Sequence, residues 1–450
     1  MHPGRRLWLL HLARMASPVG LGLAAWPLAL RADPREATHE ATREAAREAA
    51  REAPRAAAGV TARVAEKQVS AGTSTGTGAG TGASAGTSAG TSAGTSTSTG
   101  TGTSTGTSTG STVQPGRTLS FPADHGAHLA ARTEWWYATG WLGSEAAPTH
   151  GFQITFFRSR TGLAADNRSR FAARHLLFAH AAVTALALPG ATPGHAHDQR
   201  MQRWSGAPDA ATGHAALGRG AVQLDGWQLH DDGSAWRTQA KGEGLALELT
   251  LTRTQPLLLQ GQAGFSRKGP ELRHASHYYS EPQLAARGRL RVAGRETTGQ
   301  GRAWMDHEWS DEILADGVVG WDWIGINLFD GSALTAFVLR RADGSTLWAG
   351  GSYRAPGAAA RIFTADEVRF TAGRRWRSPS TAASYPVEWQ VQSPAGALQL
   401  RALADAQELD GRTSTGTVYW EGLSELLDSQ GRRIGLGYLE MTGYAAALKL

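Results

Sequence analysis

The stretch "WMDHEW", residues 304–309, places groups that donate or accept protons between two tryptophans. Asp306 follows Trp304 by two residues, so on a β-strand both side chains point to the same face. An apolar surrounding keeps a carboxylic acid protonated, and a protonated carboxyl can act as a general acid. Asp306 is therefore a candidate proton donor. Glu308 would share its face, either raising the pKa of Asp306 by its charge or serving as a structural acceptor of hydrogen bonds.

Two other stretches place polar side chains beside aromatic ones in the same alternating way. His277 and Tyr279 form an i, i+2 pair in "SHYYS". Glu134 and Trp136 form such a pair in "TEWWY", and each pair shares one strand face. We interpret Glu134 more readily as a structural acceptor than as a substrate contact. The structural alternative also applies to Asp306, because a carboxylate between tryptophans can simply accept backbone and indole N–H groups.

Histidines gather in two further places, where a metal site has to be considered. Asp124, His125 and His128 form the cluster "DHGAH", but no further ligand follows at a spacing typical of zinc sites. His195 and His197 stand in "GHAHD", within a Gly- and Pro-rich stretch that indicates a solvated loop. We therefore predict no metal site.

A serine hydrolase is another enzyme class to weigh. Ser276 directly precedes His277, but adjacent residues on a strand face opposite ways. The β-rich part of the chain also lacks the G-x-S-x-G stretch of a nucleophile elbow, which disfavours this class. Trp321 and Trp323 are interpreted as core residues, with a substrate contact as the alternative for Trp323.

Strands must position these residues, and the chain from about residue 114 onward has the patterns for them. Runs such as "LALELTLT" (245–252) and "LTAFVLR" (334–340) alternate apolar and polar residues between Gly, Asp-Gly and Pro turns. This pattern is typical of antiparallel all-β structure. The length of the region suggests two β-barrel domains, which we place at 114–295 and 296–450.

Three segments of different composition precede the β-rich region. Residues 1–32 combine Arg5 and Arg6 with an apolar stretch, the pattern of an export signal or an uncleaved membrane anchor. Residues 33–70 repeat Glu and Arg at helical spacing and predict a polar helical spacer. Residues 71–113 are nearly all Gly, Ser, Thr and Ala, which predicts a disordered linker. We expect an exported protein, periplasmic or associated with the cell envelope.

The composition excludes several classes of site. The chain has no cysteine, so disulfides, thiolate zinc sites and cysteine nucleophiles are ruled out. Its net charge of +6 comes mainly from scattered arginines, without a basic block or a nucleic-acid-binding module. We therefore expect no nucleic-acid partner.

Several of these stretches, taken together, resemble one protein family. "FPADHGAHLAARTEWWYATGWL" (121–142), "HYYSEPQL" (277–284), "GRAWMDHEWS" (301–310) and "GWDWIGINLF" (320–329) resemble the AttH-like and carotenoid 1,2-hydratase (CrtC-like) family, over about 115–450. The family is often described as predicted secreted hydrolases. The resemblance implies two lipocalin-like β-barrel domains.

The resemblance also implies a chemistry. Its hydratase branch adds water across a terminal double bond of an acyclic carotenoid without a cofactor, and its catalytic residues resemble Asp306, His277, Tyr279 and Trp304. Asp306 would protonate the alkene, His277 would orient or activate water, and aromatic faces would stabilise the cation. The aromatic residues at two of these positions look closer to the AttH-like secreted branch. Residues expected to contact substrate are Glu134, Trp136, Glu308 and Trp323.

Two functions therefore stand as expectations. The first is a cofactor-independent hydratase, favoured over a hydrolase, acting on an isoprenoid or lipid-like substrate with Asp306 as the acid. The second is a non-catalytic lipocalin-like envelope protein that binds or hands over a lipophilic ligand, with an ABC transporter as its partner. The first requires Asp306 to face an enclosed apolar pocket, whereas the second requires only the pocket.

Overall fold

The structure is a computed structural model that describes residues 112–162, 173–186, 193–206 and 213–448. The predicted signal, the helical spacer and nearly all of the linker lie outside these residues. No helix within the described ranges is long and apolar enough to cross a membrane.

Antiparallel strands make up the described structure, so the all-β prediction is confirmed. The helical content of these ranges is one short 3₁₀ turn, η1 (Ala123–His125), in which Asp124 and His125 are buried. The strands form two large sheets and one small two-stranded sheet. The alternation of apolar and polar residues in the sequence therefore indicated the correct secondary structure.

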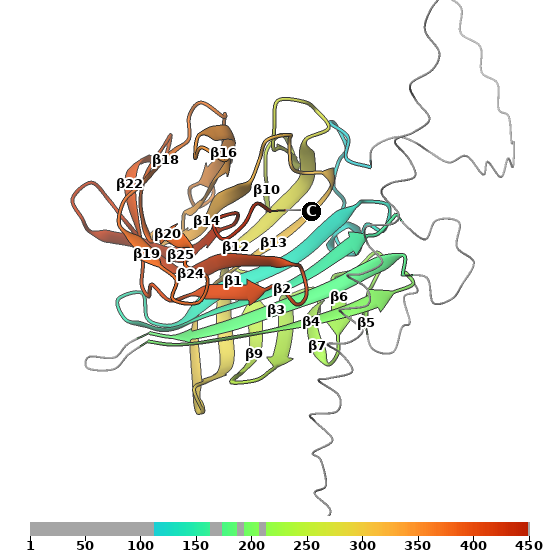
Figure 1. The fold of residues 1–450 in the computed structure, drawn as a ribbon, viewed down its shortest axis with the longest axis horizontal. Coiled ribbons are helices and arrows are strands. Elements are labelled where there is room, and N and C mark those ends of the chain that lie inside the picture. Colours follow the sequence, from blue (N-terminus) through green and yellow to red (C-terminus); the bar gives the residue numbers. More distant parts are fainter. Residues whose placement is uncertain (1–111, 163–172, 187–192, 207–212, 449–450) are drawn as a thin grey trace, which may run out of the picture. The chain divides into compact units, whose positions relative to one another are not determined.

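The first sheet contains thirteen strands and rolls into a nearly closed barrel (Figure 1). Its order is β4-β3-β2-β1-β13-β12-β9-β8-β7-β6-β5, with β10 and β11 paired to β12. The bounds are β1 (Thr133–Gly143), β2 (Pro148–Arg160), β3 (His175–Ala185), β4 (Gly194–Trp204), β5 (Gly213–Ala215), β6 (Ala221–Leu224), β7 (Trp227–Asp231), β8 (Ala235–Lys241), β9 (Leu245–Thr252), β10 (Leu258–Leu259), β11 (Phe265–Arg267), β12 (Ala275–Val292) and β13 (Arg295–Glu312).

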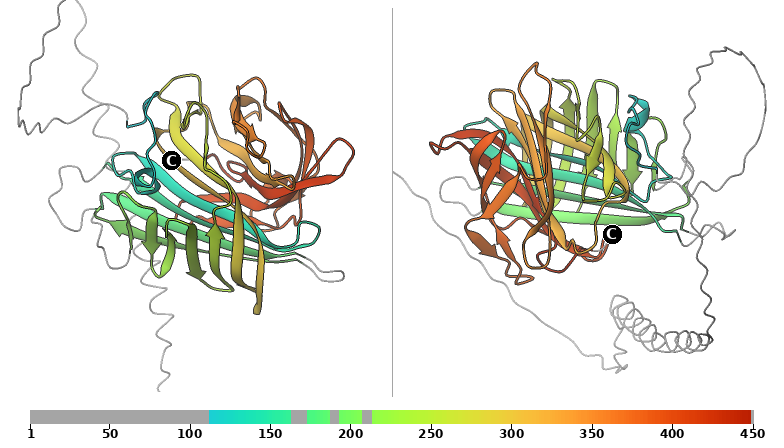
Figure 2. Two further views of the ribbon diagram at one scale, coloured as in Figure 1. Left: turned by 180° about the vertical axis from the view of Figure 1, so that it is seen from behind. Right: turned by 90° about the horizontal axis from the view of Figure 1, so that it is seen from above.

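The second sheet contains ten strands and lies against the first, as the orange and red ribbons show (Figure 2). Its order is β17-β16-β15-β14-β25-β24-β22-β21-β18, with β23 paired to β24. The bounds are β14 (Gly320–Leu328), β15 (Ala333–Arg340), β16 (Thr346–Arg354), β17 (Arg361–Phe363), β18 (Arg369–Ala372), β21 (Glu388–Ser393), β22 (Gly396–Ala402), β23 (Glu408–Gly411), β24 (Thr417–Leu427) and β25 (Arg433–Met441); the two-stranded sheet pairs β19 (Arg375–Arg377) with β20 (Ser384–Pro386).

Burial along the strands shows which part of the first sheet the second sheet covers. Strand β9 alternates, with Leu245, Leu247, Leu249 and Leu251 buried in the barrel and the residues between them facing outward. Strand β1 is instead buried on both faces over most of its length. One face of β1 points into the barrel, and the other is covered by the second sheet. A side chain on β1 or its neighbours can therefore be buried on either side of the first sheet.

The chain passes from the first sheet to the second between β13 and β14. Strand β13 pairs with β1 and with β12, so residues 296–312 belong to the first sheet, although the sequence analysis placed them in the second domain. The reason is that β12 and β13 form one long hairpin, whose turn the sequence analysis took as a domain boundary. The change of sheet falls at 313–319.

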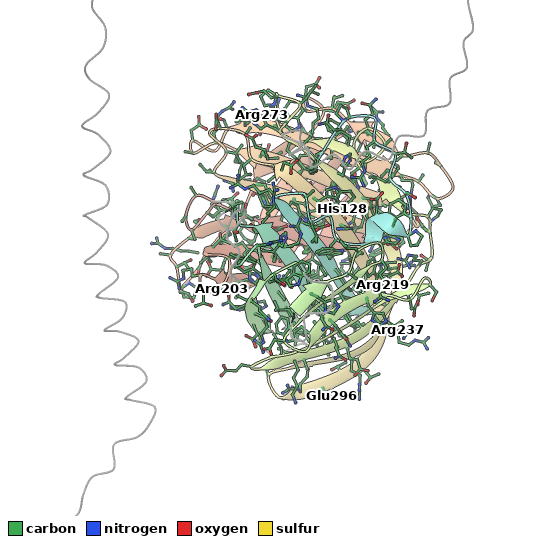
Figure 3. All side chains as sticks on the ribbon, turned by 90° about the vertical axis from the view of Figure 1, so that its right-hand side faces the viewer. His128, Arg203, Arg219, Arg237, Arg273 and Glu296 are labelled. Carbon is green, nitrogen blue, oxygen red and sulfur yellow. The ribbon has the colours of Figure 1, made fainter. Side chains whose placement is uncertain are left out.

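Charged side chains occupy the outward-facing positions of the barrel. Arg203, Arg237 and Glu296 are exposed and point away from the sheets (Figure 3). The alternating strands thus keep their long charged residues in water and bury their apolar residues.

Candidate functional site between the two sheets

A cavity of about 250 Å³ lies where the two sheets face each other. Cross-strand pairing aligns one row of side chains across the first sheet, namely Ser280, Asp306, Tyr137, Thr155 and His180. A second row crosses the second sheet, namely Phe337, Trp323, Glu440 and Glu421. Apart from Ser280, all of these residues line the cavity. The cavity therefore has aromatic walls with several carboxyl groups set into them.

Asp306 is held in this wall by two aromatic hydrogen-bond donors. The Trp304 Nε1–H donates to Asp306 Oδ1 at 2.7 Å, and the Tyr278 hydroxyl donates to Asp306 Oδ2 at 2.7 Å. Trp323, from the second sheet, donates its Nε1–H to the Tyr278 oxygen at 3.1 Å. Asp306 is 3% exposed, and no basic side chain in the described ranges forms an ion pair with it. The hydrogen bonds thus fix the position of the Asp306 carboxyl group, and no basic side chain among the described residues compensates its negative charge.

The surroundings favour the protonated form of Asp306. Burial raises the pKa of its carboxyl to about 7, although hydrogen bonds from Ser280, Tyr278 and Trp304 act in the opposite direction. The charge of Glu308 adds to the rise, which is one of the two roles that the sequence left open for it, but burial is the larger cause. A carboxylic acid with a pKa near neutrality can hold a proton and release it at physiological pH.

Glu308 lies on the Asp306 face of β13, and its contacts favour a structural role. The Ser276 hydroxyl donates to it, and Lys268 Nζ lies 3.1 Å from Glu308 Oε1. The Lys268 ammonium also lies over the rings of Tyr278 and Phe337, at 4.7 and 4.2 Å from their centroids. Glu308 therefore anchors a buried lysine at the edge of the cavity.

His277 and Tyr279 are not in the same site as Asp306. Tyr279 pairs with His307, and Tyr278 pairs with Glu308, so it is Tyr278 that shares the Asp306 face. Each i, i+2 pair does share one face of its strand. The register of β12 against β13, however, places the His277–Tyr279 pair and the Trp304–Asp306 pair on opposite faces of the sheet. Tyr278 is the residue that the sequence analysis missed. The doublet "YY" was a usable signal, because alternation forces one of its two tyrosines onto each face.

His277 is buried on the barrel side of the sheet, away from the cavity. Its Nε2 accepts a hydrogen bond from the Gln114 backbone N–H at 3.4 Å, and its ring packs against Phe265 and Trp309. Burial is the largest cause of the lowering of its pKa to about 4, so the imidazole is neutral at pH 7. It cannot orient a water at Asp306 from this position.

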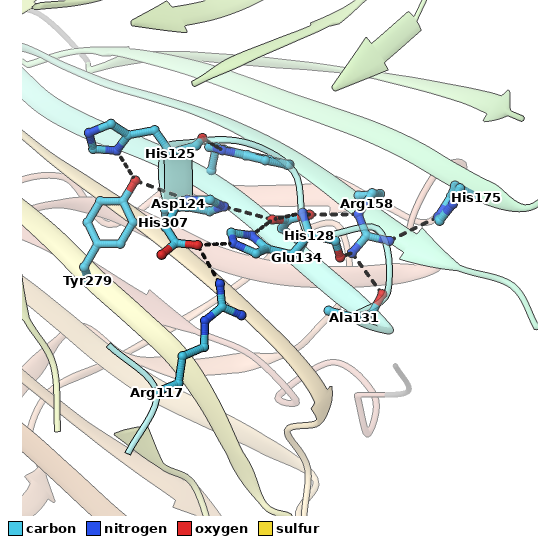
Figure 4. A network of polar contacts seen from close by, with 11 residues as sticks. Arg117, Asp124, His125, His128, Ala131, Glu134, Arg158, His175, Tyr279 and His307 are labelled. Carbon is cyan, nitrogen blue, oxygen red and sulfur yellow. Dashed lines mark hydrogen bonds and ion pairs between the residues drawn. The ribbon is translucent and has the colours of Figure 1, made fainter. Parts of the chain in front are cut away.

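Glu134 is the centre of a polar network inside the barrel (Figure 4). It accepts hydrogen bonds from Arg158 Nε at 2.8 Å, from His128 Nδ1 at 2.8 Å and from His307 Nε2 at 3.0 Å. The other His128 ring nitrogen lies 2.9 Å from Asp124 Oδ1. Glu134 is therefore a structural acceptor. Trp136, expected to contact substrate, instead stacks on His307 in this interior, with ring centroids 4.7 Å apart.

The same network brings together donors that could hold a metal ion. Ligand atoms of His128, Glu134 and His307 lie within 4.8 Å of one another. However, His128 bridges two carboxylates, which raise its pKa despite the opposing effect of burial. The Arg158 guanidinium already supplies positive charge to Glu134. These contacts form a closed ion-pair network without an added cation.

Two histidines and two tryptophans singled out in the sequence lie on strands. His195 and His197 lie on β4 rather than in a solvated loop, and they bond to Thr184 and to the Asp410 backbone N–H. The loop prediction is wrong because the strand begins at Gly194, directly before these histidines. Trp321 and Trp323 line the cavity. Trp323 is therefore in a position to contact a ligand.

Comparison with known proteins supports the fold and the resemblance. The sequence model of the AttH-like family matches residues 112–444. A crystal structure of a candidate AttH from Nitrosomonas europaea is 42% identical, with a TM-score of 0.66, over 74% of this chain and 99% of that one. Kievitone hydratase from Nectria haematococca is 14% identical, with a TM-score of 0.53 over 73% of this chain and 94% of that one, which indicates a shared fold. No match was found among the curated proteins.

Proposed function

Since the chain belongs to the AttH-like family, we propose that it is a cofactor-independent hydratase that adds water across a double bond of a lipophilic substrate. The observation that supports this most is Asp306, a buried carboxyl group in the wall of an aromatic cavity, without an ion-pair partner among the described residues. An isolated double bond is a weak base, so its protonation needs a strong, positioned acid in a water-poor site.

Tyr278 connects Asp306 to the cavity. When Asp306 is protonated, its O–H can donate to the Tyr278 oxygen, which frees the tyrosine proton for the substrate. The π electrons of the alkene form a new C–H bond with that proton, while the Asp306 proton replaces it on Tyr278. A carbocation and the Asp306 carboxylate result. A water oxygen then bonds to the cation, and the proton that the water loses returns to Asp306 through Tyr278.

Aromatic rings near Tyr278 would stabilise the cation. Trp323 and Tyr137 meet edge to face, with ring centroids 5.5 Å apart, and both line the cavity. The faces of Trp and Tyr rings carry partial negative charge that attracts a cation in a desolvated site. A carbocation held there is also close to the carboxylate that Asp306 becomes after proton transfer.

The second candidate is a lipocalin-like carrier in the cell envelope that binds a lipophilic ligand without changing it. The aromatic cavity supports both functions. We propose that either function acts outside the cytoplasm, because the sequence predicts an export signal, and that the carrier passes its ligand to an ABC transporter. What separates the two candidates is whether Asp306 is needed for a chemical change.

The test uses the full-length protein, envelope lipid extract and ¹⁸O-labelled water, with mass spectrometry of the lipids. The hydratase predicts a product heavier than its substrate by one labelled water, and the product disappears with Asp306→Asn. Asparagine keeps the size of the side chain and its acceptor oxygen but has no acidic proton. A lipid retained unchanged by both proteins, without a labelled product, would refute the hydratase and support the carrier.

A further inference from the structure

Three polar atoms in the cavity wall are buried without a well-aligned hydrogen bond among the described residues, although the Tyr137 hydroxyl and the Glu421 carboxyl group interact with each other. They are the hydroxyl oxygens of Tyr137 and Thr155 and one carboxylate oxygen, Oε1, of Glu421. The three residues are only 5%, 2% and 3% exposed. Buried polar atoms in folded proteins are nearly always well hydrogen-bonded, so a group of atoms in a cavity wall without well-aligned bonds indicates a place for a ligand atom.

These atoms gather at one part of the cavity. Tyr137 and Thr155 are directly opposite each other on β1 and β2, so their side chains are neighbours on the same face. Glu421 reaches them from the second sheet, and Gln153 of the first sheet donates from its Nε2 to Glu421 Oε2 at 2.9 Å. Gln153 precedes Thr155 by two residues on β2 and thus holds the carboxyl group beside it. This contact leaves Glu421 Oε1 without a well-aligned donor, and the Glu421 carboxyl group interacts with the Tyr137 hydroxyl.

The charges around the cavity decide which kind of ligand atom fits. The acidic residues that line it are Glu134, Asp306, Glu308, Glu421 and Glu440. The basic side chains in the wall are already paired, Lys268 with Glu308 at 3.1 Å and Arg158 with Glu134 at 2.8 Å. An anionic ligand would therefore meet several carboxyl groups and no unpaired cation among the described lining residues. A neutral oxygen would meet both donors and acceptors.

We propose that Tyr137, Thr155 and Glu421 form a subsite that binds a neutral hydroxyl or phenol oxygen of the substrate. This inference rests on the proposed function, because it assigns a substrate class to the same cavity. Tyr137 is the cross-strand neighbour of Asp306, so the bound oxygen and the double bond lie at adjoining positions along one molecule. The substrate is then a lipophilic alcohol or phenol, and neither a pure hydrocarbon nor a fatty acid.

Three small probes that differ at one end test the subsite. Citronellol carries a trisubstituted double bond and a hydroxyl, 2,6-dimethyl-2-octene has the same skeleton without the hydroxyl, and citronellate replaces it with a carboxylate. Affinity for the full-length protein is measured by titration of tryptophan fluorescence, since Trp323 lines the cavity. We expect citronellol to bind about ten-fold more tightly than the hydrocarbon, the effect of one or two hydrogen bonds to buried partners, and citronellate to bind more weakly than citronellol.

Substitutions in the subsite show whether its residues cause the tighter binding of the alcohol. Thr155→Val and Tyr137→Phe each remove one hydroxyl at nearly constant shape and should bring the affinities for citronellol and the hydrocarbon closer together. Thr139→Val is the control, because Thr139 is buried on the same face of β1 but does not line the cavity. It should leave the preference unchanged.

The outcomes separate the subsite from the proposed function. Equal affinities for citronellol and the hydrocarbon, a preference that survives both variants, or no binding of any probe would overturn the subsite. If the affinities for citronellol and the hydrocarbon are equal but ¹⁸O uptake depends on Asp306, the hydratase is supported and the subsite is refuted. A preference lost in both variants, with no ¹⁸O uptake, supports the subsite and refutes the hydratase.

Discussion

At the scale of single residues, the contrast between Asp306 and Glu134 shows how partners decide the chemistry of a buried carboxyl group. Both are nearly inaccessible to water. Glu134 receives Arg158 and two histidines, which lower its pKa against the effect of burial. Asp306 receives only uncharged donors, and burial raises its pKa to about 7. The first carboxyl is fixed as an anion, and the second can exchange a proton near neutral pH.

The raised pKa of Asp306 predicts a pH-dependent cost to stability. In the unfolded chain the group ionises near pH 4, whereas in the folded chain it keeps its proton to about pH 7. Stability is therefore lost as pH rises between these values. Asp306→Asn, which has no charge to bury, should be more stable than the native protein at pH 8, by up to a few kcal/mol, with the difference shrinking toward pH 4. Urea unfolding at both pH values measures it. An equal difference at both would show that Asp306 has an ordinary pKa.

The Glu134 network predicts a large loss of stability when its balance of charges is broken. Glu134→Gln leaves the buried Arg158 without its anionic partner, which should cost about 3–5 kcal/mol in urea unfolding. The control is Glu248→Gln, because the Arg289–Glu248 pair is exposed although its atoms lie 2.6 Å apart. It should cost less than about 1 kcal/mol. Similar costs for the two variants would contradict the assigned role of the network.

At the scale of elements, adjacent residues of β12 should differ in function. Tyr278→Phe removes the hydroxyl between Asp306 and the cavity, so kcat should fall roughly 100-fold, as for the loss of a proton-transfer group. Tyr279→Phe removes a hydroxyl that contacts His125 Nδ1 at 2.6 Å and His307 Nδ1 at 3.1 Å, inside the barrel. It should lower the unfolding midpoint and leave kcat nearly unchanged. A greater loss of kcat in Tyr279→Phe would mean that the acid works from the barrel side.

Alternation also explains how much could be predicted from the sequence. The strands, the antiparallel class and the shared face of Trp304, Asp306 and Glu308 follow from period-two patterns, which are local. The separation of His277 and Tyr279 from Asp306 depends on the register between β12 and β13 and on a bulge in their pairing between Glu281 and Leu284. Register is a property of two strands, and a shift by one residue reverses the face. The Glu421 side of the cavity belongs to a sheet more than a hundred residues later, beyond the reach of spacing rules.

At the scale of the whole molecule, the cavity exists because the two sheets face each other, so a contact between them should affect catalysis. Trp323→Phe keeps a ring against Tyr137 but loses the N–H that reaches the Tyr278 oxygen across the sheets. We expect kcat to fall about ten-fold, with little change in KM. Trp389→Phe is the control, because the Trp389 N–H, in the core of the second sheet, has no hydrogen-bond partner among the described residues. Equal kcat in both variants would show that the sheets act independently.

The central claim is that Asp306 carries a proton in the folded protein near neutral pH. Infrared difference spectroscopy of the native protein minus Asp306→Asn measures this directly and needs no substrate. We predict a band of a protonated carboxyl group at pH 6 that is replaced by carboxylate bands as pH rises through about 7. A difference spectrum that shows only carboxylate at pH 6 would contradict the claim, because Asp306 could then accept hydrogen bonds in the cavity wall but could not protonate a double bond there.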